Sequence, residues 1–324
     1  MRSCAAFPTG PASVIRFAPS PPIPEKLPMP LSGLIAAPHT PFHADGSLNP
    51  DIIDAQCEHL LRAGVTGAFV CGTTGEGLSL TSAERRAVTE RWVKVARGRL
   101  AVIVHVGHAA AAEAKDLAAH AESLGVAAVS AVAPFYHRAA DEIGVVHFLR
   151  TIADGSPRTP FYFYDIPSTT RVNVNTLNVM KLAGESIPSF AGVKFSNPDL
   201  VLLQECLQFQ SRKYNVLFGV DEMLLAAWSL GVRGAVGSTY NYLAPLYHTM
   251  LKSPPDEAQK LQFASVRIVR LLEKFGGLAA GKAMMKLVGI DCGPLRTPLK
   301  IVDSEALKSE LVKAGLWDSV SHAP

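Results

Sequence analysis

The chain has 324 residues, a hydrophobic fraction of 48% and a formal net charge of +3. A chain this apolar and this weakly charged is expected to fold around a large core, which excludes a largely disordered protein. The small positive balance is spread along the sequence, which argues against nucleic acid or an anionic membrane as the main partner.

The apolar runs and the cysteines indicate the cellular setting. No apolar run approaches the ~20 residues that a transmembrane helix needs. The five cysteines are an odd number without a CxxC pair, which predicts reduced, buried thiols rather than a disulfide framework. We therefore expect a cytoplasmic protein with no membrane partner.

The first thirty residues differ in composition from the rest of the chain. They are dense in proline and contain no acidic residue before Glu25. This composition predicts a disordered tail over 1–30. Arginines and serines without acids also fit a transit peptide loosely, but proline this frequent fits an amphipathic presequence badly.

After the tail, short apolar runs typical of β-strands alternate with helical stretches. The expected strands cover 34–40, 67–72, 101–107, 128–136, 160–167, 190–196, 215–220 and 234–240. Between them, a capping signal at Thr81 and Glu84 predicts a helix over 82–97, and an alanine-rich stretch predicts one over 113–124. Strands that are apolar on both faces and alternate with helices pair in parallel under a helical cover.

About eight such units in one chain predict a (β/α)₈ TIM barrel. Helices expected over 258–274 and 281–288 follow the eighth unit. We therefore predict a barrel over 31–250 and a C-terminal helical extension over 251–324 that packs on the barrel. A doubly wound open sheet is the alternative, but its GxGxxG turn is missing after the first strand.

Polar residues gather at the C-terminal ends of the predicted strands, where the active sites of barrels lie. They are Thr73 and Thr74 after the second strand, Tyr136 at the fourth, Tyr164 in the fifth, Lys194 in the sixth, Asp221 and Glu222 after the seventh, and Ser238 after the eighth.

Lys194 stands in the middle of the apolar run PSFAGVKFSNPDL. A buried lysine is rare, because taking an ammonium out of water costs several kcal/mol. In an apolar barrel mouth its pKa falls, and the neutral amine can attack a ketone to form a Schiff base. The alternative is a structural lysine paired with Asp221 or Asp199, and the spacing alone leaves both interpretations open.

The other motifs also allow two interpretations each. The turn GTTGE offers backbone N–H groups and two hydroxyls to a small anion such as a 2-oxo acid carboxylate, or is an ordinary turn with an N-cap. Tyr164 is either a proton-transfer phenol or a core residue. His105 and His108 lack a carboxylate at ligand spacing, so we expect packing or surface histidines and no metal site.

Several motifs together carry a resemblance that covers the chain from about Leu31 to the C-terminal helices. GTTGEGLSLTSAERR, FYFYDIP, GVKFS and GVDEMLL…GAVGSTYNY resemble the dihydrodipicolinate synthase/N-acetylneuraminate lyase family of Schiff-base aldolases. The resemblance implies a homotetramer of barrels without a metal or organic cofactor. Its lyase branch cleaves N-acetylneuraminate reversibly to N-acetylmannosamine and pyruvate.

The resemblance also implies roles for single residues. Lys194 matches the Schiff-base lysine, and Thr73 and Thr74 match the pair that binds the pyruvoyl carboxylate. Tyr164 matches the phenol that moves protons, and Tyr136 the tyrosine that reaches a neighbouring subunit and completes a relay through Thr73 to Tyr164. The positions implied to hold the sugar's hydroxyl-bearing chain are Ser196, Gly219, Asp221, Glu222 and Ser238.

The loop after the fifth strand departs from the family pattern. Arg171 stands where family lyases commonly carry a glycine. The synthase branch places an arginine at the position of Thr169 to grip a second carboxylate, which argues against dihydrodipicolinate synthesis here. A 2-keto-3-deoxy sugar-acid aldolase, a dihydrodipicolinate synthase and a non-enzymatic barrel used for binding remain the alternatives.

Overall fold

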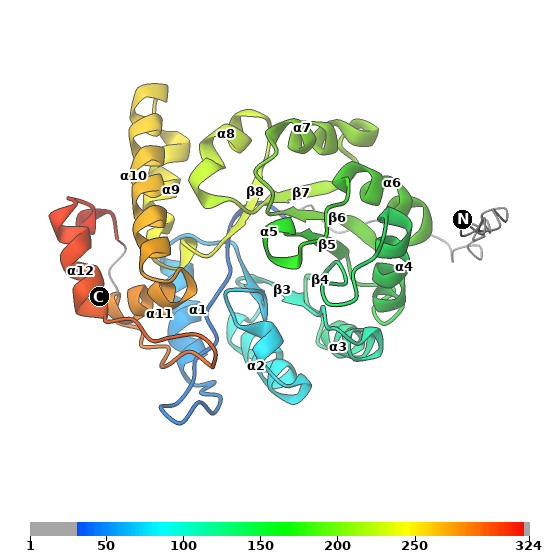
Figure 1. The fold of residues 1–324 in the computed structure, drawn as a ribbon, viewed down its shortest axis with the longest axis horizontal. Coiled ribbons are helices and arrows are strands. Elements are labelled where there is room, and N and C mark those ends of the chain that lie inside the picture. The colour runs from blue at the N-terminus through cyan, green and yellow to red at the C-terminus, as the bar shows by residue number, and fades with distance from the viewer. Residues whose placement is uncertain (1–30, 321–324) are drawn as a thin grey trace, which may run out of the picture.

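The computed structural model describes residues 31–320, so the predicted tail over 1–30 lies outside the described residues. Eight parallel strands form a closed barrel in chain order (Figure 1). The barrel closes where β1 pairs with β8, with Gly33 opposite Gly234 and Ala36 opposite Gly237. This closure confirms the predicted TIM barrel and excludes an open doubly wound sheet. The strands are β1 Gly33–Ala36, β2 Gly67–Val70, β3 Ala101–His105, β4 Ala128–Val132, β5 Phe161–Asp165, β6 Phe190–Phe195, β7 Asn215–Phe218 and β8 Gly234–Gly237.

Helices cover the outside of the barrel between the strands. They are α1 Ile52–Arg62, α2 Ser82–Ala96, α3 Ala111–Ser123, α4 Glu142–Ala153, α6 Thr176–Ser186, α7 Leu200–Gln208, α8 Leu224–Ser229 and α9 Tyr240–Lys252. The short α5 Pro167–Thr170 follows β5 at the C-terminal end of the barrel instead. No helix within 31–320 is both long and apolar enough to cross a membrane.

The capping signal predicted for α2 is present in the structure. Thr81 caps α2 with a reciprocal capping box, in which its hydroxyl accepts from the Glu84 N–H and the Glu84 carboxylate accepts from the Thr81 N–H.

Further helices follow α9, as the sequence predicted. They are α10 Pro255–Lys274, α11 Leu278–Leu287 and α12 Ser304–Lys313, of which α12 was not predicted from the sequence. Figure 1 shows α10 beside α9, with α11 and α12 next to it at the same side of the barrel. A segment without helix or strand, over 288–303, connects α11 to α12.

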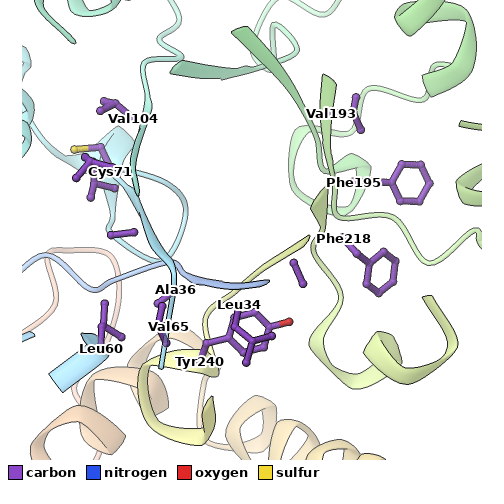
Figure 2. Close-up of a cluster of buried hydrophobic side chains, with 14 of the residues drawn as sticks. Leu34, Ala36, Leu60, Val65, Cys71, Val104, Val193, Phe195, Phe218 and Tyr240 are labelled. Carbon is purple, nitrogen blue, oxygen red and sulfur yellow. The ribbon is translucent and has the colours of Figure 1, made fainter. Parts of the chain in front are cut away.

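The strands alternate between two buried apolar layers. In β6, Val193 and Phe195 join the layer between sheet and helices, where Phe218 of β7 lies nearby (Figure 2). The barrel interior is filled by another cluster that includes Phe69 and Tyr164. Because side chains alternate along a strand, the position between Val193 and Phe195 must face the interior. That position is Lys194.

Candidate active site

Lys194 is buried at the C-terminal end of the barrel interior. Its side chain is 4% exposed, and its Nζ lies 3.9 Å from the ring centroids of both Phe69 and Tyr164. Within residues 31–320 it forms no ion pair, so the predicted alternative of a pairing with Asp221 or Asp199 does not occur there. Burial lowers the pKa of Lys194, and Tyr164 and Asp221 oppose this shift without reversing it.

Tyr164 lies opposite Lys194 in the ladder between β5 and β6. Its hydroxyl is 3.4 Å from the Thr73 hydroxyl, a long hydrogen bond in which either oxygen can donate. The ring packs edge-on against Phe69 and His105, which fixes its direction. The structure therefore brings amine, phenol and threonine hydroxyl together on three strands or their ends.

Thr73 and Thr74 belong to a closed turn between β2 and the short helix Gly77–Ser79. The Glu76 N–H donates to the Thr73 carbonyl at 3.1 Å, and the Gly77 N–H donates to the Gly72 carbonyl at 3.0 Å. The cap of α2 is Thr81, not either of these threonines. Their hydroxyls are thus not used as helix caps, and both residues line the cavity above Lys194.

This cavity has a volume of about 770 Å³ and opens at the C-terminal ends of the strands. All predicted site residues except Tyr136 line it: Thr73, Thr74, Tyr164, Lys194, Ser196, Gly219, Asp221, Glu222 and Ser238. Tyr136 is 78% exposed and contacts the ring of His137 instead. Within one chain, the structure does not bring Tyr136 to the other site residues.

Asp221 is held firmly from one side only. Its Oδ2 accepts hydrogen bonds from the Thr239 N–H at 3.0 Å and from the Thr239 hydroxyl at 2.6 Å. The chain of hydroxyls continues through Tyr247, 2.9 Å from Thr239, to Ser265 of α10 at 2.7 Å. The Asp221 Oδ1 is buried and has no hydrogen-bond partner among the described residues. Burial raises the pKa of Asp221 and of its neighbour Glu222.

His39, after β1, lines the cavity and was missed by the sequence analysis. It is 1% exposed, and neither ring nitrogen has a hydrogen-bond partner within residues 31–320. Burial, with a smaller effect of Lys282, lowers the pKa of His39 to about 3, so the ring is neutral. Gly281 of α11 leaves room for this ring, because a Cβ there would lie 2.7 Å from the His39 Cε1. The only signal in the sequence was its position near the C-terminal end of the expected strand 34–40.

The two histidines of HVGH have local contacts. His105 is buried, and its Nδ1 lies 3.1 Å from the Cys71 carbonyl oxygen. Burial lowers the pKa of His105 to about 3. The His108 Nδ1 accepts a hydrogen bond from the Ala110 N–H. No cluster of His, Cys, Asp and Glu suited to a metal ion occurs in the part of the chain that the structure describes.

The loop after β5 explains why a glycine would fit at position 171. Arg171 has φ = 56°, in the left-handed region that favours glycine, and its side chain is exposed. Ser168 lines the large cavity, whereas Thr169 lines a smaller one of about 230 Å³ together with Leu78 and Phe135. Neither Thr169 nor Arg171 lines the cavity that contains Lys194.

Comparison with known proteins assigns the chain to a family. Residues 30–314 match the Dihydrodipicolinate synthetase family. The chain is 41% identical to the N-acetylneuraminate lyase of Rattus norvegicus over 284 residues, which is 85% of this chain and 89% of that protein. It is 38% identical to the Homo sapiens N-acetylneuraminate lyase over 300 residues, covering 90% and 94% of the two chains. The solved Proteus mirabilis N-acetylneuraminate lyase superposes with a TM-score of 0.86 at 39% identity, covering 90% of this chain and 99% of that one. The chain therefore belongs to the dihydrodipicolinate synthetase family.

Proposed function

We propose that this protein is a Schiff-base aldolase that cleaves N-acetylneuraminate reversibly into N-acetylmannosamine and pyruvate. The observation that carries the proposal is Lys194, a buried amine with a lowered pKa and no ion-pair partner within residues 31–320, at the mouth of a barrel. Relatives about 40% identical over most of the chain are N-acetylneuraminate lyases. These two facts together favour that substrate.

The reaction begins with attack of the neutral Lys194 amine on the ketone carbon of the open-chain sugar acid. Loss of water from the carbinolamine gives a protonated imine, which withdraws electrons from the neighbouring bonds. A base, either Tyr164 or the substrate carboxylate beside it, removes the proton from the C4 hydroxyl. The C3–C4 bond then breaks, its electrons move into the imine to form an enamine, and N-acetylmannosamine leaves.

The second half of the reaction restores the amine. The enamine takes a proton at C3, which we assign to the Tyr164 hydroxyl because this side chain lies beside the Lys194 amine that carries the enamine. Water then hydrolyses the imine, releasing pyruvate and the free Lys194. Each step is reversible, so the same groups can condense pyruvate with N-acetylmannosamine.

The two ends of the cavity suit the two ends of this substrate. We assign the carboxylate to Thr73 and Thr74, whose hydroxyls and backbone N–H groups can donate to an anion. The polyhydroxyl chain lies against the opposite wall, where carboxylates accept hydrogen bonds from hydroxyl groups. The residues of that wall are Ser196, Gly219, Asp221, Glu222 and Ser238.

Dihydrodipicolinate synthesis fits this site less well. A second substrate carboxylate would need a cation in the cavity at the loop after β5, but Thr169 is neutral and faces the smaller cavity. Arg171 does not line the large cavity either. An aldolase for a 2-keto-3-deoxy sugar acid would share Lys194 and Tyr164, so the choice of aldehyde distinguishes the two lyase functions.

We also propose a homotetramer in which Tyr136 acts in a neighbouring subunit. Tyr136 is the most exposed large hydrophobic side chain among residues 31–320. A cavity of about 230 Å³, lined by Leu78, Phe135 and Thr73, offers a path for a phenol from outside to reach Thr73.

A reducing cytoplasmic location agrees with the state of the described cysteines, which are buried and unpaired: Cys57, Cys71, Cys206 and Cys292.

Incubation with N-acetylneuraminate and an assay for pyruvate tests the proposal directly. Borohydride added with pyruvate should reduce the imine to a stable adduct on the peptide that contains Lys194. Lys194→Ala should lose both the adduct and the turnover while its circular dichroism is unchanged. Labelling of another lysine would refute the assignment of Lys194. Condensation of pyruvate with a panel of aldehydes tests which sugar the site accepts. A lack of turnover with every 2-oxo acid would favour a non-enzymatic barrel.

A further inference from the structure

The turn that carries Thr73 and Thr74 ends in a buried carboxylate with an unusual backbone. Glu76 has φ = 51°, in the left-handed region that non-glycine residues rarely adopt, and its side chain is 1% exposed. The next residue must be glycine, since a Cβ at Gly77 would lie 1.8 Å from the Cys71 carbonyl oxygen. Such a backbone persists only where its surroundings hold it in place.

The C-terminal extension supplies both partners of this carboxylate. The Nζ of Lys282 in α11 lies 2.9 Å from Glu76 Oε1, and the backbone N–H of Arg296 donates to Oε2 at 2.9 Å. Oε1 accepts no well-aligned hydrogen bond from the described residues, so the charge of Lys282 is its partner. Lys282 is 4% exposed and is itself fixed by donation to the Pro294 carbonyl at 2.7 Å.

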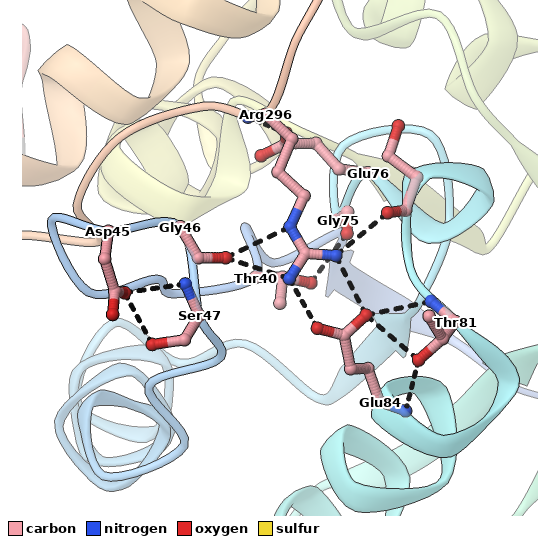
Figure 3. Close-up of polar contacts among 10 residues, drawn as sticks. Thr40, Asp45, Gly46, Ser47, Gly75, Glu76, Thr81, Glu84 and Arg296 are labelled. Carbon is pink, nitrogen blue, oxygen red and sulfur yellow. Dashed lines mark hydrogen bonds and ion pairs between the residues drawn. The ribbon is translucent and has the colours of Figure 1, made fainter.

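The side chain of Arg296 anchors the segment that offers this N–H. Figure 3 shows its guanidinium between Gly46 and Glu84. It donates to both Glu84 carboxylate oxygens, to the Gly46 carbonyl at 2.9 Å and to the Ser79 carbonyl at 2.9 Å. The hydrogen bond from Arg296 is the main reason that the pKa of Glu84 falls to about 2. With the guanidinium fixed, the backbone N–H that Glu76 accepts is fixed as well.

The opposite side of the turn is also held. The Thr40 hydroxyl, after β1, donates to the Gly75 carbonyl at 2.6 Å (Figure 3). We propose that Lys282 and Arg296 are positioning residues that hold Thr73 and Thr74 where they receive the substrate carboxylate. The inference rests on the proposed function, which assigns the carboxylate to these two threonines. It makes the C-terminal extension a part of the active site.

The proposal predicts a separation between binding and chemistry. Without the charge of Lys282, the Glu76 carboxylate keeps only the Arg296 N–H as a partner, and its buried charge is no longer neutralised. We expect the carboxylate to shift toward water and to displace the turn. Thr73 and Thr74 then lose their alignment with the carboxylate. Lys194 belongs to β6 and does not contact this network. The amine chemistry should therefore continue once a 2-oxo acid is bound.

The test compares two methionine substitutions on the same helix in the full chain. Lys282→Met removes the buried charge, whereas Lys286→Met removes an exposed one, whose side chain is 61% exposed and pairs with Asp291 at 3.5 Å. The readout is the pyruvate concentration that gives half-maximal borohydride trapping at Lys194. We expect Lys282→Met to raise it at least about tenfold, with the maximal trapping rate within about threefold, while Lys286→Met changes it by less than about twofold.

A second variant keeps the test decisive if Lys282→Met fails to fold. Glu84→Gln weakens the anchor of Arg296 at a partly exposed position, where the Glu84 side chain is 23% exposed. We expect it to raise the half-maximal pyruvate concentration about threefold with no change in the maximal rate.

The outcomes distinguish a failure of the proposed aldolase function from a failure of the positioning role of Lys282 and Arg296. If wild type traps no pyruvate at Lys194, the proposed function itself fails. If wild type traps pyruvate and a folded Lys282→Met variant has the same half-maximal concentration, the positioning role is wrong and the Lys282–Glu76 pair serves stability alone. The positioning role would also be overturned by equal shifts of the half-maximal pyruvate concentration in Lys282→Met and Lys286→Met. If Lys282→Met does not fold, an unchanged half-maximal concentration in Glu84→Gln would overturn it.

Discussion

Replacing Lys194 with methionine should make the folded protein more stable while it abolishes imine formation. The substitution keeps an unbranched side chain of similar length and removes the amine. Lys194 is 4% exposed and has no ion-pair partner within residues 31–320, so a charged amine there is not compensated. A residue kept for reactivity is expected to cost stability in this way.

The structure sets the size of the expected gain. Burying an ammonium costs several kcal/mol. The rings of Phe69 and Tyr164, each 3.9 Å from Nζ, return about 0.5–2 kcal/mol by cation–π attraction, and Asp221 adds longer-range attraction. The amine also limits the penalty by losing its proton. We expect a net gain of about 1–3 kcal/mol, or about 2–6 °C in Tm for a chain of this length.

The pH dependence follows from the sign of the pKa shift. Because the folded-state pKa of Lys194 is lowered, the folded wild type binds fewer protons than the unfolded chain between that value and the usual lysine pKa of about 10.4. Wild-type stability therefore rises with pH in this window. The advantage of Lys194→Met should be largest below the folded-state pKa and should shrink as the pH approaches about 10.4.

Urea unfolding followed by circular dichroism at fixed protein concentration measures these differences. The matched control is Lys282→Met, which removes the partner of a buried carboxylate and should destabilise the fold by about 3–5 kcal/mol. If Lys194→Met were less stable than wild type at neutral pH, the amine would be charged and stabilised there. The account of Lys194 as a neutral nucleophile would then be wrong.

Three further substitutions test the roles of the other site residues. Tyr164→Phe should lower lyase turnover about 10²–10⁴-fold while pyruvate trapping at Lys194 persists, because the phenol moves a proton and the amine forms the imine; an equal loss of trapping would point to a packing role. Asp221→Ala should weaken N-acetylneuraminate turnover far more than pyruvate trapping, and equal losses would mean that Asp221 supports Lys194 instead. When Tyr136→Phe and Lys194→Ala chains are unfolded and refolded together, the mixed tetramers should be more active than tetramers of either variant alone. No recovery of activity despite mixed assembly would exclude a tyrosine that acts in a neighbouring subunit.

The fold was predictable because its signals are local. Between Val193 and Phe195, period-two alternation points Lys194 toward the interior. Counted from Phe190, the same period would point Lys194 outward, because the register shift near Ala191 puts Phe190 on the side of Val193. The capping box of Thr81 and Glu84 likewise lies within four residues. Helix α12 was not predicted although local signals mark both of its ends: Asp303 caps the first turn, and Gly315, with φ = 65°, follows the last turn. Only its packing against α11 depends on the tertiary fold.

The site was predictable only where its residues follow strands. In a barrel the strand ends meet at one face, so spacing along the chain was enough to bring Thr73, Tyr164 and Lys194 to one cavity. The partners of Glu76 are different, because Lys282 and Arg296 lie about two hundred residues further along the chain. No local pattern connects them, since the contact arises when the extension folds back on the barrel.

The two buried lysines show how one side chain acquires two different uses. Lys194 and Lys282 are each 4% exposed, and burial lowers the pKa of both. Lys282 has the Glu76 carboxylate at 2.9 Å, which favours the ammonium and makes it a structural cation. Among the described residues, Lys194 has no carboxylate within ion-pair distance, and the Phe69 and Tyr164 side chains beside it hold the ammonium more weakly than a carboxylate would. The proposed role of Lys194 as nucleophile therefore depends on the absence of a carboxylate within ion-pair distance: a carboxylate placed beside it would favour the ammonium and should abolish imine formation.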